Sequence, residues 1–237
     1  MKSVCLLSAA LCLALPAHAV STVQFTPAVL NTALLCNHDP SVGPVKHSLQ
    51  WIRDSTGKLQ TMTEVWYDRQ GCFTKVNMVD KLNGNEFHLE NSAGTLRSHS
   101  GQRIAGKVNQ ACQITELENE SGRYTLAYNA RGLLETMTNR ETGNVAQRFE
   151  YRHGQFPVRI RDYQNHTDNV FSYPAGNPQF LDMQMVLNSP ESTVWLKQSC
   201  TYQPDGNANL CAMTTALDEH YQDAPVMMFS NHRVEYY

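Results

Sequence analysis

The sequence predicts an all-β fold, an antiparallel β-meander of repeated hairpins stapled by disulfides. From residue 46 onward, short segments rich in Thr, Val, Tyr, Phe and Met alternate with Gly, Asn and Asp, which is typical of strands and turns. Five short polar turns each contain a glycine, and an apolar residue follows two positions later. Two cysteines, Cys200 and Cys211, flank another turn symmetrically. These three observations define the expected fold class.

Residues 1–19 have the layout of a secretory signal peptide. Lys2 precedes an apolar run that ends in a proline and small residues up to Ala19. The run is shorter than the roughly 20 residues of a membrane-spanning helix, so we expect cleavage after Ala19, export to the periplasm and no transmembrane span afterwards. A lipid anchor is the alternative, but Cys12 follows Leu11 inside the apolar run and provides no credible lipobox.

Residues 20–45 are expected to form an N-terminal lead-in, and residues 46–237 a single β-rich domain. The lead-in contains Pro27, Pro40 and Pro44, which interrupt regular structure. Its short apolar patch, residues 29–35, is long enough for one or two helical turns. We therefore expect a loop-like segment ahead of the domain.

The glycine-centred turns predict the hairpins within the domain. Asn or Asp begins a turn through its own side chain, and glycine accepts the positive φ that a hairpin turn needs. The apolar residue two positions later then points to one face of the outgoing strand. The glycines are Gly57, Gly71, Gly94, Gly132 and Gly154, followed by Leu59, Phe73, Leu96, Leu134 and Phe156.

Repetition of these turns predicts a stacked array of hairpins. Two of the intervals between glycines are 23 and 22 residues long, which accommodates a pair of strands and two turns. The pattern resembles the tyrosine–aspartate repeats of Rhs-type wrapped sheets, so we expect a YD-repeat-like wrapped sheet. It breaks down at about residues 98–109, where we expect a longer loop, and a second break spans residues 174–190.

The cysteines predict disulfides rather than a metal site. Five remain after cleavage, and an oxidising compartment favours disulfides. Cys200 and Cys211 are equidistant from the turn at Asp205-Gly206, so the hairpin places them opposite each other. Cys72 and Cys112 are the next pair by elimination, which leaves Cys36 as a free thiol. A bridge from Cys36 to either of them remains an alternative. The sequence has no Cys-x-x-Cys spacing, which is typical of zinc sites, so it does not indicate zinc.

No catalytic residues, cofactor or metal site can be nominated from the sequence. The chain lacks Gly-x-Ser-x-Gly, a Walker loop, a dinucleotide-binding glycine fingerprint and His-Glu-x-x-His. His88 and His99 flank one hairpin, but a chance surface arrangement explains them better than a metal pair. After cleavage the chain has 18 basic and 22 acidic residues. This mildly acidic balance gives no reason to expect a nucleic-acid partner.

The aromatic residues and the C-terminus point to a packed sheet outside the membrane. The terminal residues suggest an outer-membrane barrel strand, but alternate positions Glu235, Arg233 and Asn231 would make its lipid face polar. The aromatic residues could line a ligand-binding sheet face, although sheet packing alone accounts for their spacing. They are Trp51, Trp66, Tyr67, Phe73, Tyr128, Tyr151 and Trp195.

Several short segments together resemble the YnfC-type family of bacterial envelope lipoproteins. They are Asp39-Pro40 with residues 43–46, residues 71–73, 112–117, 197–202 through Cys211, and 235–237. The resemblance implies an exported protein, usually lipid-anchored, with no assigned activity and no defined ligand residues. It also implies that Cys72, Cys112, Cys200 and Cys211 occupy the family's cysteine positions, whereas Cys36 is extra.

The resulting hypothesis is an exported periplasmic protein of the cell envelope that binds or scaffolds another component without catalysis. Its partner would be an envelope protein or a small ligand. The alternative is a hydrolase acting on a cell-wall or envelope substrate, with a site assembled from separated histidines and carboxylates.

Overall fold

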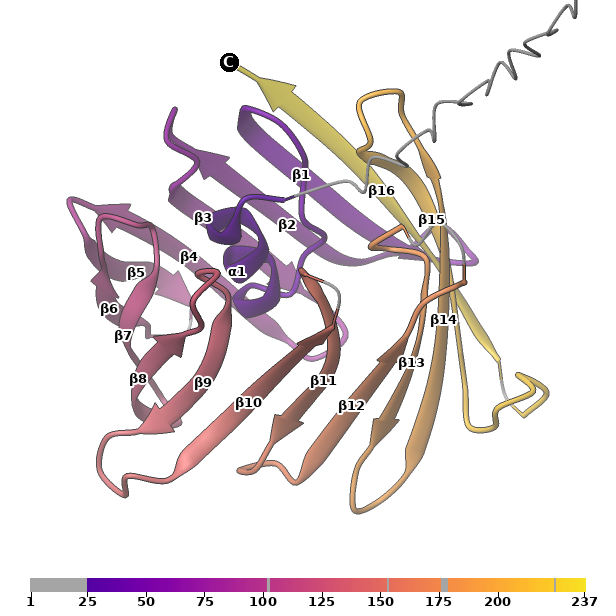
Figure 1. Cartoon of the computed structure of the whole chain (residues 1–237). Helices are drawn as coiled ribbons and strands as arrows, with labels where there is room; N and C mark the ends of the chain where they lie inside the picture. The colour runs from indigo at the N-terminus through magenta and orange to yellow at the C-terminus, as the bar shows by residue number, and fades with distance from the viewer. Residues whose placement is uncertain (1–24, 102, 153, 176–178, 224) are drawn as a thin grey trace, which may run out of the picture.

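The described part of the chain forms a closed barrel of antiparallel strands with one short helix (Figure 1). The computed structural model describes residues 25–101, 103–152, 154–175, 179–223 and 225–237, so the expected signal peptide, residues 1–19, lies outside the described residues. In this part of the chain the elements are α1 (Pro27–Leu35), β1 (Val45–Asp54), β2 (Leu59–Tyr67), β3 (Phe73–Asp80), β4 (Asn85–Ser92), β5 (Thr95–Gly101), β6 (Ala105–Val108), β7 (Ile114–Asn119), β8 (Gly122–Tyr128), β9 (Leu134–Asn139), β10 (Val145–Arg152), β11 (Phe156–Asp162), β12 (Thr167–Ser172), β13 (Met183–Asn188), β14 (Thr193–Tyr202), β15 (Ala208–Ala216) and β16 (Val226–Tyr236).

Each strand pairs with its sequence neighbours, and β1 also pairs with β16, which closes the sheet. In that closing pair His47 lies opposite Glu235, and Trp51 lies opposite Asn231. The all-β, antiparallel and disulfide-linked class is confirmed. The open wrapped sheet is replaced by a barrel, because closure pairs the two strand edges that a meander would leave exposed.

Asx turns join the strands as the glycine pattern predicts. The side chain of Asp68 accepts hydrogen bonds from the backbone N–H groups of Gln70 and Cys72 at 2.8 and 3.0 Å. Gly71 in this turn has a φ of 83°, the left-handed region that glycine adopts without strain. The apolar residue that follows, Phe73, starts β3 and is 1% exposed.

The expected loop at residues 98–109 is wrong. This segment contains the end of β5 and all of β6. Gly101 and Gly106 occur there because neighbouring backbone passes very close: a Cβ would lie 1.9 Å from the Glu86 carbonyl oxygen and 2.2 Å from that of Glu116. Glycine in a strand often marks such an approach. Likewise, β13 lies within the second expected break, residues 174–190.

The apolar patch of the lead-in is helical, as its length allows: residues 27–35 form α1, and residues 36–44 are loop. Thr26 caps the helix by accepting a hydrogen bond from Val29 N, and proline occupies the first turn. Five consecutive residues of the helix, 29–33, are buried, so it is enclosed on all sides rather than lying on a surface. Within the described residues, no helix is long and apolar enough to cross a membrane.

The helix lies against the inner side of the barrel (Figure 1) and takes part in both of its apolar clusters. Val29 packs with buried residues of β2 to β10, including Val65 and Val76. Leu30 packs with Leu133, Phe180 and Cys211. α1 therefore fills one part of the barrel interior and leaves the remainder for other side chains or a ligand.

Candidate functional site

A cavity of about 490 Å³ lies inside the barrel beside α1. Leu30, Ala33 and Leu34 of the helix form one wall, and inward-facing residues of the surrounding strands form the others. Leu82, in the turn between β3 and β4, also lines the cavity and is 59% exposed. An exposed turn therefore borders the cavity. The cavity volume is in the range of small-molecule sites.

Methionines and other apolar side chains of β12 to β16 form an apolar band along one side of the cavity. Strand register places Phe171 opposite Met185, Met185 opposite Leu196, and Met213 opposite Met228. All five residues line the cavity, as does Met183. Methionine is flexible and polarizable, so a wall of this composition adapts to ligand shape.

Polar side chains occupy the part of the cavity near the α1–β1 connection and the β3–β4 turn. They include His38, Asp39 and Asp80. His38 is buried, and its Nε2 lies 3.3 Å from the Tyr67 hydroxyl oxygen. Desolvation lowers the pKa of His38 to about 4, so its imidazole is neutral near pH 7. Its Nδ1 is buried without a hydrogen-bond partner.

A serine, a histidine and an aspartate meet behind this polar region, but their geometry differs from a catalytic triad. The same atom, His232 Nε2, lies 3.0 Å from Ser230 Oγ and 3.2 Å from Asp39 Oδ2. A triad needs the carboxylate at one imidazole nitrogen and the nucleophile at the other. Gln50 Nε2 donates to both Asp39 and Ser230 at 2.8 and 2.9 Å, and Ser230 is fully buried. The cluster is a buried polar network.

The same region contains Asp39, Cys211 and His232 within 4.8 Å of one another, a spacing that could suit a metal. Cys211 is oxidised to a disulfide with Cys200, so its sulfur is not a thiolate and cannot serve as a normal metal ligand. The two remaining candidate ligands, Asp39 and His232, lie 3.2 Å apart and do not by themselves define a metal centre.

Among the described cysteines, two disulfides form, Cys72–Cys112 and Cys200–Cys211. Cys200 and Cys211 lie opposite each other between β14 and β15, with Cα atoms 4.0 Å apart. Cys36 is free and buried at the end of α1, and desolvation raises its pKa to about 12. It is therefore a packed thiol of the helix terminus rather than part of an unstructured segment.

The paired histidines considered from the sequence do not form a common site. His88 Nδ1 lies 2.9 Å from Asn77 Oδ1, and its Nε2 lies 3.0 Å from Glu86. His99 pairs with a different carboxylate, Glu90, at 2.9 Å. Both histidines are on the solvent side of the sheet, where such ion pairs contribute little.

The aromatic residues are divided between the two faces of the barrel. Tyr67 and Phe73 are buried in the core. Trp66 stacks on His47 with ring centroids 4.7 Å apart, and the Lys75 ammonium lies 5.0 Å from the Trp66 ring. This outer cluster is held by cation–π and stacking contacts, so it needs no ligand to explain it.

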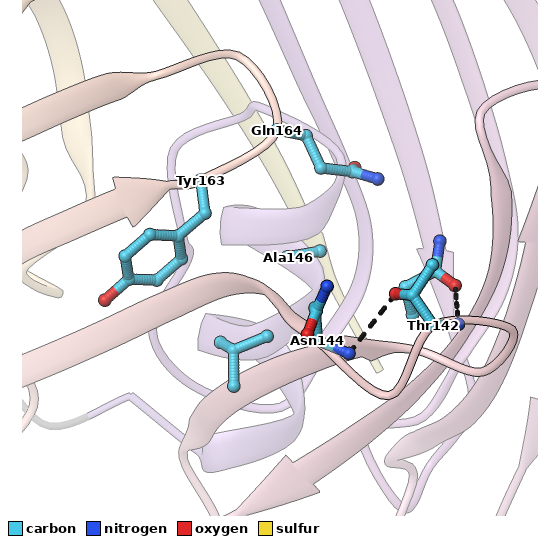
Figure 2. A pocket seen from close by; sticks show the side chains of 7 residues that line it. Thr142, Asn144, Ala146, Tyr163 and Gln164 are labelled. Carbon is cyan, nitrogen blue, oxygen red and sulfur yellow. Dashed lines mark hydrogen bonds between the residues drawn. The ribbon is translucent and has the colours of Figure 1, made fainter.

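A second hollow, of about 530 Å³, lies on the surface between two turns (Figure 2). Thr142 and Asn144 are joined by a 3.2 Å hydrogen bond within the β9–β10 turn, and Tyr163 and Gln164 follow β11. Gln164 accepts a hydrogen bond from the buried Tyr124. The polar groups of this hollow already form hydrogen bonds within the protein. It is therefore a weaker candidate for a ligand site than the interior cavity.

The residues of the cavity band were missed by the sequence analysis. Their signal was the alternation Met183-x-Met185 in β13, together with Met213 and Met228 in the last two strands. Alternation indicates a shared face. It does not indicate which face is internal until the barrel is known to close.

Comparison with known proteins agrees with the resemblance noted in the sequence. The chain is 23% identical over 222 residues to the "UPF0257 lipoprotein YnfC" of Escherichia coli K12, with 91% of each chain covered, and equally similar to that of Shigella flexneri. Its fold is similar to the crystal structure of a porin-like protein from Bacteroides uniformis. That match has a TM-score of 0.53 and 14% identity, and covers 81% of this chain and 98% of the other.

The distant structural match supports the barrel architecture alone, since its sequence identity is low. The model of the uncharacterised protein family UPF0257 matches residues 1–237, the whole length of the sequence. The chain therefore belongs to the uncharacterised protein family UPF0257.

Proposed function

We propose that this chain is an exported, non-enzymatic binding protein of the cell envelope that holds a small apolar ligand inside its barrel. The cavity beside α1 carries the proposal. It combines about 490 Å³ of space with methionine-rich apolar side chains and with polar groups from several elements. Sites for small molecules have this composition.

The outer surface of the barrel supports action in an aqueous compartment. Ion pairs lie across its strands: Arg161 with Glu150 at 3.2 Å and Lys107 with Glu116 at 3.0 Å. Arg233 and Glu235 lie on the outward side of β16, 3.2 Å apart. A lipid-facing arginine or lysine costs about 2–4 kcal/mol at the bilayer midplane. We therefore propose a periplasmic barrel rather than one embedded in the outer membrane, with any lipid anchor located outside residues 25–237.

The hydrolase alternative receives no support from the site. Ser230 and Asp39 share one nitrogen of His232, and Ser230 is inaccessible. Without an oriented base and an exposed nucleophile, the cluster has no route to acyl transfer.

Binding of the neutral fluorophore N-phenyl-1-naphthylamine tests the proposal. The folded chain should enhance its fluorescence with saturable, one-to-one binding. Met185→Trp, which fills the cavity, should weaken binding at least about tenfold. Val186→Trp is the matched control, because Val186 is the next residue of β13 and does not line the cavity.

Thermal melting should first establish that both variants fold. Absence of saturable binding by the wild type would refute the proposed function. Equal loss of binding in the two folded variants would show that the probe binds elsewhere.

A further inference from the structure

We propose that the cavity selects an elongated apolar ligand with a neutral or cationic head group and discriminates against an anionic one. This inference rests on the proposed function and specifies its ligand class. It follows from the apolar side chains that β12 to β16 contribute to the cavity and from the sign of the charged side chains that line it.

The charged side chains that line the cavity are all acidic. Asp39 and Asp80 contribute carboxylates, whereas no lysine or arginine is found among the described residues that line it. His38 adds no positive charge, because its imidazole is neutral near pH 7. A ligand carboxylate or phosphate would therefore lose its hydration without gaining a cationic partner.

Asp80 is the main source of this discrimination. It is 8% exposed, and its side chain accepts hydrogen bonds from Leu82 N at 2.9 Å and from Asn83 Nδ2 at 2.7 Å. These donors are neutral, so they hold the carboxylate in place without cancelling its charge. Asp39 is also held in place, by Gln50 Nε2 at 2.8 Å and by the imidazole of His232 at 3.2 Å. An anionic head group beside Asp80 would experience like-charge repulsion in a poorly solvated site.

Neutral polar groups remain available for an uncharged head group. Gln50 and Asn169 line the cavity with His38. The Oδ1 of Asn169 and the Nδ1 of His38 are buried without hydrogen-bond partners. A hydroxyl, amide or amine can donate to Asn169 Oδ1. A hydroxyl or amide can pair with His38 Nδ1 in either imidazole tautomer, because such a group can both donate and accept.

The apolar wall extends over several strands, which suits a chain rather than a compact group. Phe171, Met185 and Leu196 form a row across β12 to β14. Met213 and Met228 form a second apolar pair across β15 and β16, two residues away from that row, because Met213 lies opposite Gln198. Each methylene that this wall removes from water should strengthen binding up to about fourfold.

Isothermal calorimetry with decanol, decylamine and decanoate at neutral pH tests the inference, because these ligands share a chain and differ in head group. Decanol and decylamine should each bind at least about tenfold more tightly than decanoate. Octanol should bind roughly tenfold more weakly than decanol. Asp80→Asn should improve decanoate binding. The amide oxygen of asparagine can still accept the hydrogen bond from Leu82 N, but the negative charge is removed. The exposed Glu219→Gln is the control.

The outcomes separate the two claims. Decanoate binding as tightly as decanol or decylamine would overturn the head-group inference and leave the proposed function intact. No binding of any of the three ligands, together with no binding of the fluorophore, would refute the proposed function itself. Because the wild-type comparison does not depend on Asp80→Asn folding, the inference can be refuted without that variant.

Discussion

Asn31 of α1 and Leu134 of β9 are hydrogen-bonded across 103 residues of sequence: Leu134 N donates to Asn31 Oδ1 at 2.9 Å. The amide of the same asparagine donates to the Gly132 carbonyl oxygen at 2.8 Å. One buried side chain thus satisfies two backbone groups of the β8–β9 turn and attaches the helix to the barrel wall. The position of α1, and with it one wall of the cavity, depends on this contact.

Replacing this anchor should destabilise the protein. Asn31→Ala should lower the free energy of unfolding by about 1–3 kcal/mol, since it leaves a buried backbone N–H without an acceptor. Urea denaturation measures the change. Asn209→Ala, at an exposed position of β15, is the control and should change stability by less than about 0.5 kcal/mol. Equal effects of the two substitutions would contradict the anchoring role.

The two disulfides should differ in their contribution to stability. Cys72–Cys112 closes a separation of 40 residues and Cys200–Cys211 one of 11. In the loop-entropy model the bridges contribute about 4 and about 3 kcal/mol. The double variant Cys72→Ala/Cys112→Ala should therefore be less stable than Cys200→Ala/Cys211→Ala in urea. The reverse order would show that packing around the fully buried Cys211 outweighs loop entropy.

The free thiol should be unreactive in the folded state. Burial raises the pKa of Cys36 to about 12, so at mildly alkaline pH very little thiolate is present, and the side chain is inaccessible. For the chain that begins at Val20, Ellman's reagent should detect no rapidly reacting thiol in the native protein. In guanidinium it should detect one. Detection of more than one thiol in guanidinium would mean that the disulfides had not formed.

His38 should make stability depend on pH. Its pKa of about 4 in the folded state lies below the ordinary histidine value of 6.5. As the pH falls, the unfolded chain therefore protonates this histidine at a higher pH than the folded chain does. The stability present above pH 6.5 should be lost as pH falls toward about 4, by up to about 3 kcal/mol. Asp39, His232 and Tyr67 surround the imidazole, but desolvation is the main cause.

Urea denaturation across this range checks the effect. His38→Gln should have a flatter pH profile than the wild type, whereas the exposed His220→Gln should follow it. Parallel pH profiles for the wild type and His38→Gln would show that another group governs the loss of stability at low pH.

Local sequence chemistry predicted the turns because each depends on only a few neighbouring residues. Asp68 with Gly71 and Asn129 with Gly132 were recognisable because glycine marks the left-handed position. The equivalent turn at Asn109 was missed, since Cys112 occupies that position with a φ of 63°. A non-glycine residue at positive φ leaves no comparable signal.

Long-range features could not be predicted in the same way. Pairing of His47 with Glu235 joins the two ends of the described barrel, and no local pattern encodes such closure. The short apolar run of α1 was ambiguous between loop and helix, and its burial follows only from the surrounding barrel. The cavity depends on both features, so its lining emerged only from the folded chain.

Methionine-methyl NMR tests the central claim, binding inside the barrel, most directly. Titration with decanol should shift the methyl signals of Met183, Met185 and the other two methionines that line the cavity, Met213 and Met228. The signal of Met227, which is 46% exposed, should stay unchanged. Shifts confined to Met227, or no shift at any of the four cavity methionines at saturating decanol, would contradict the account.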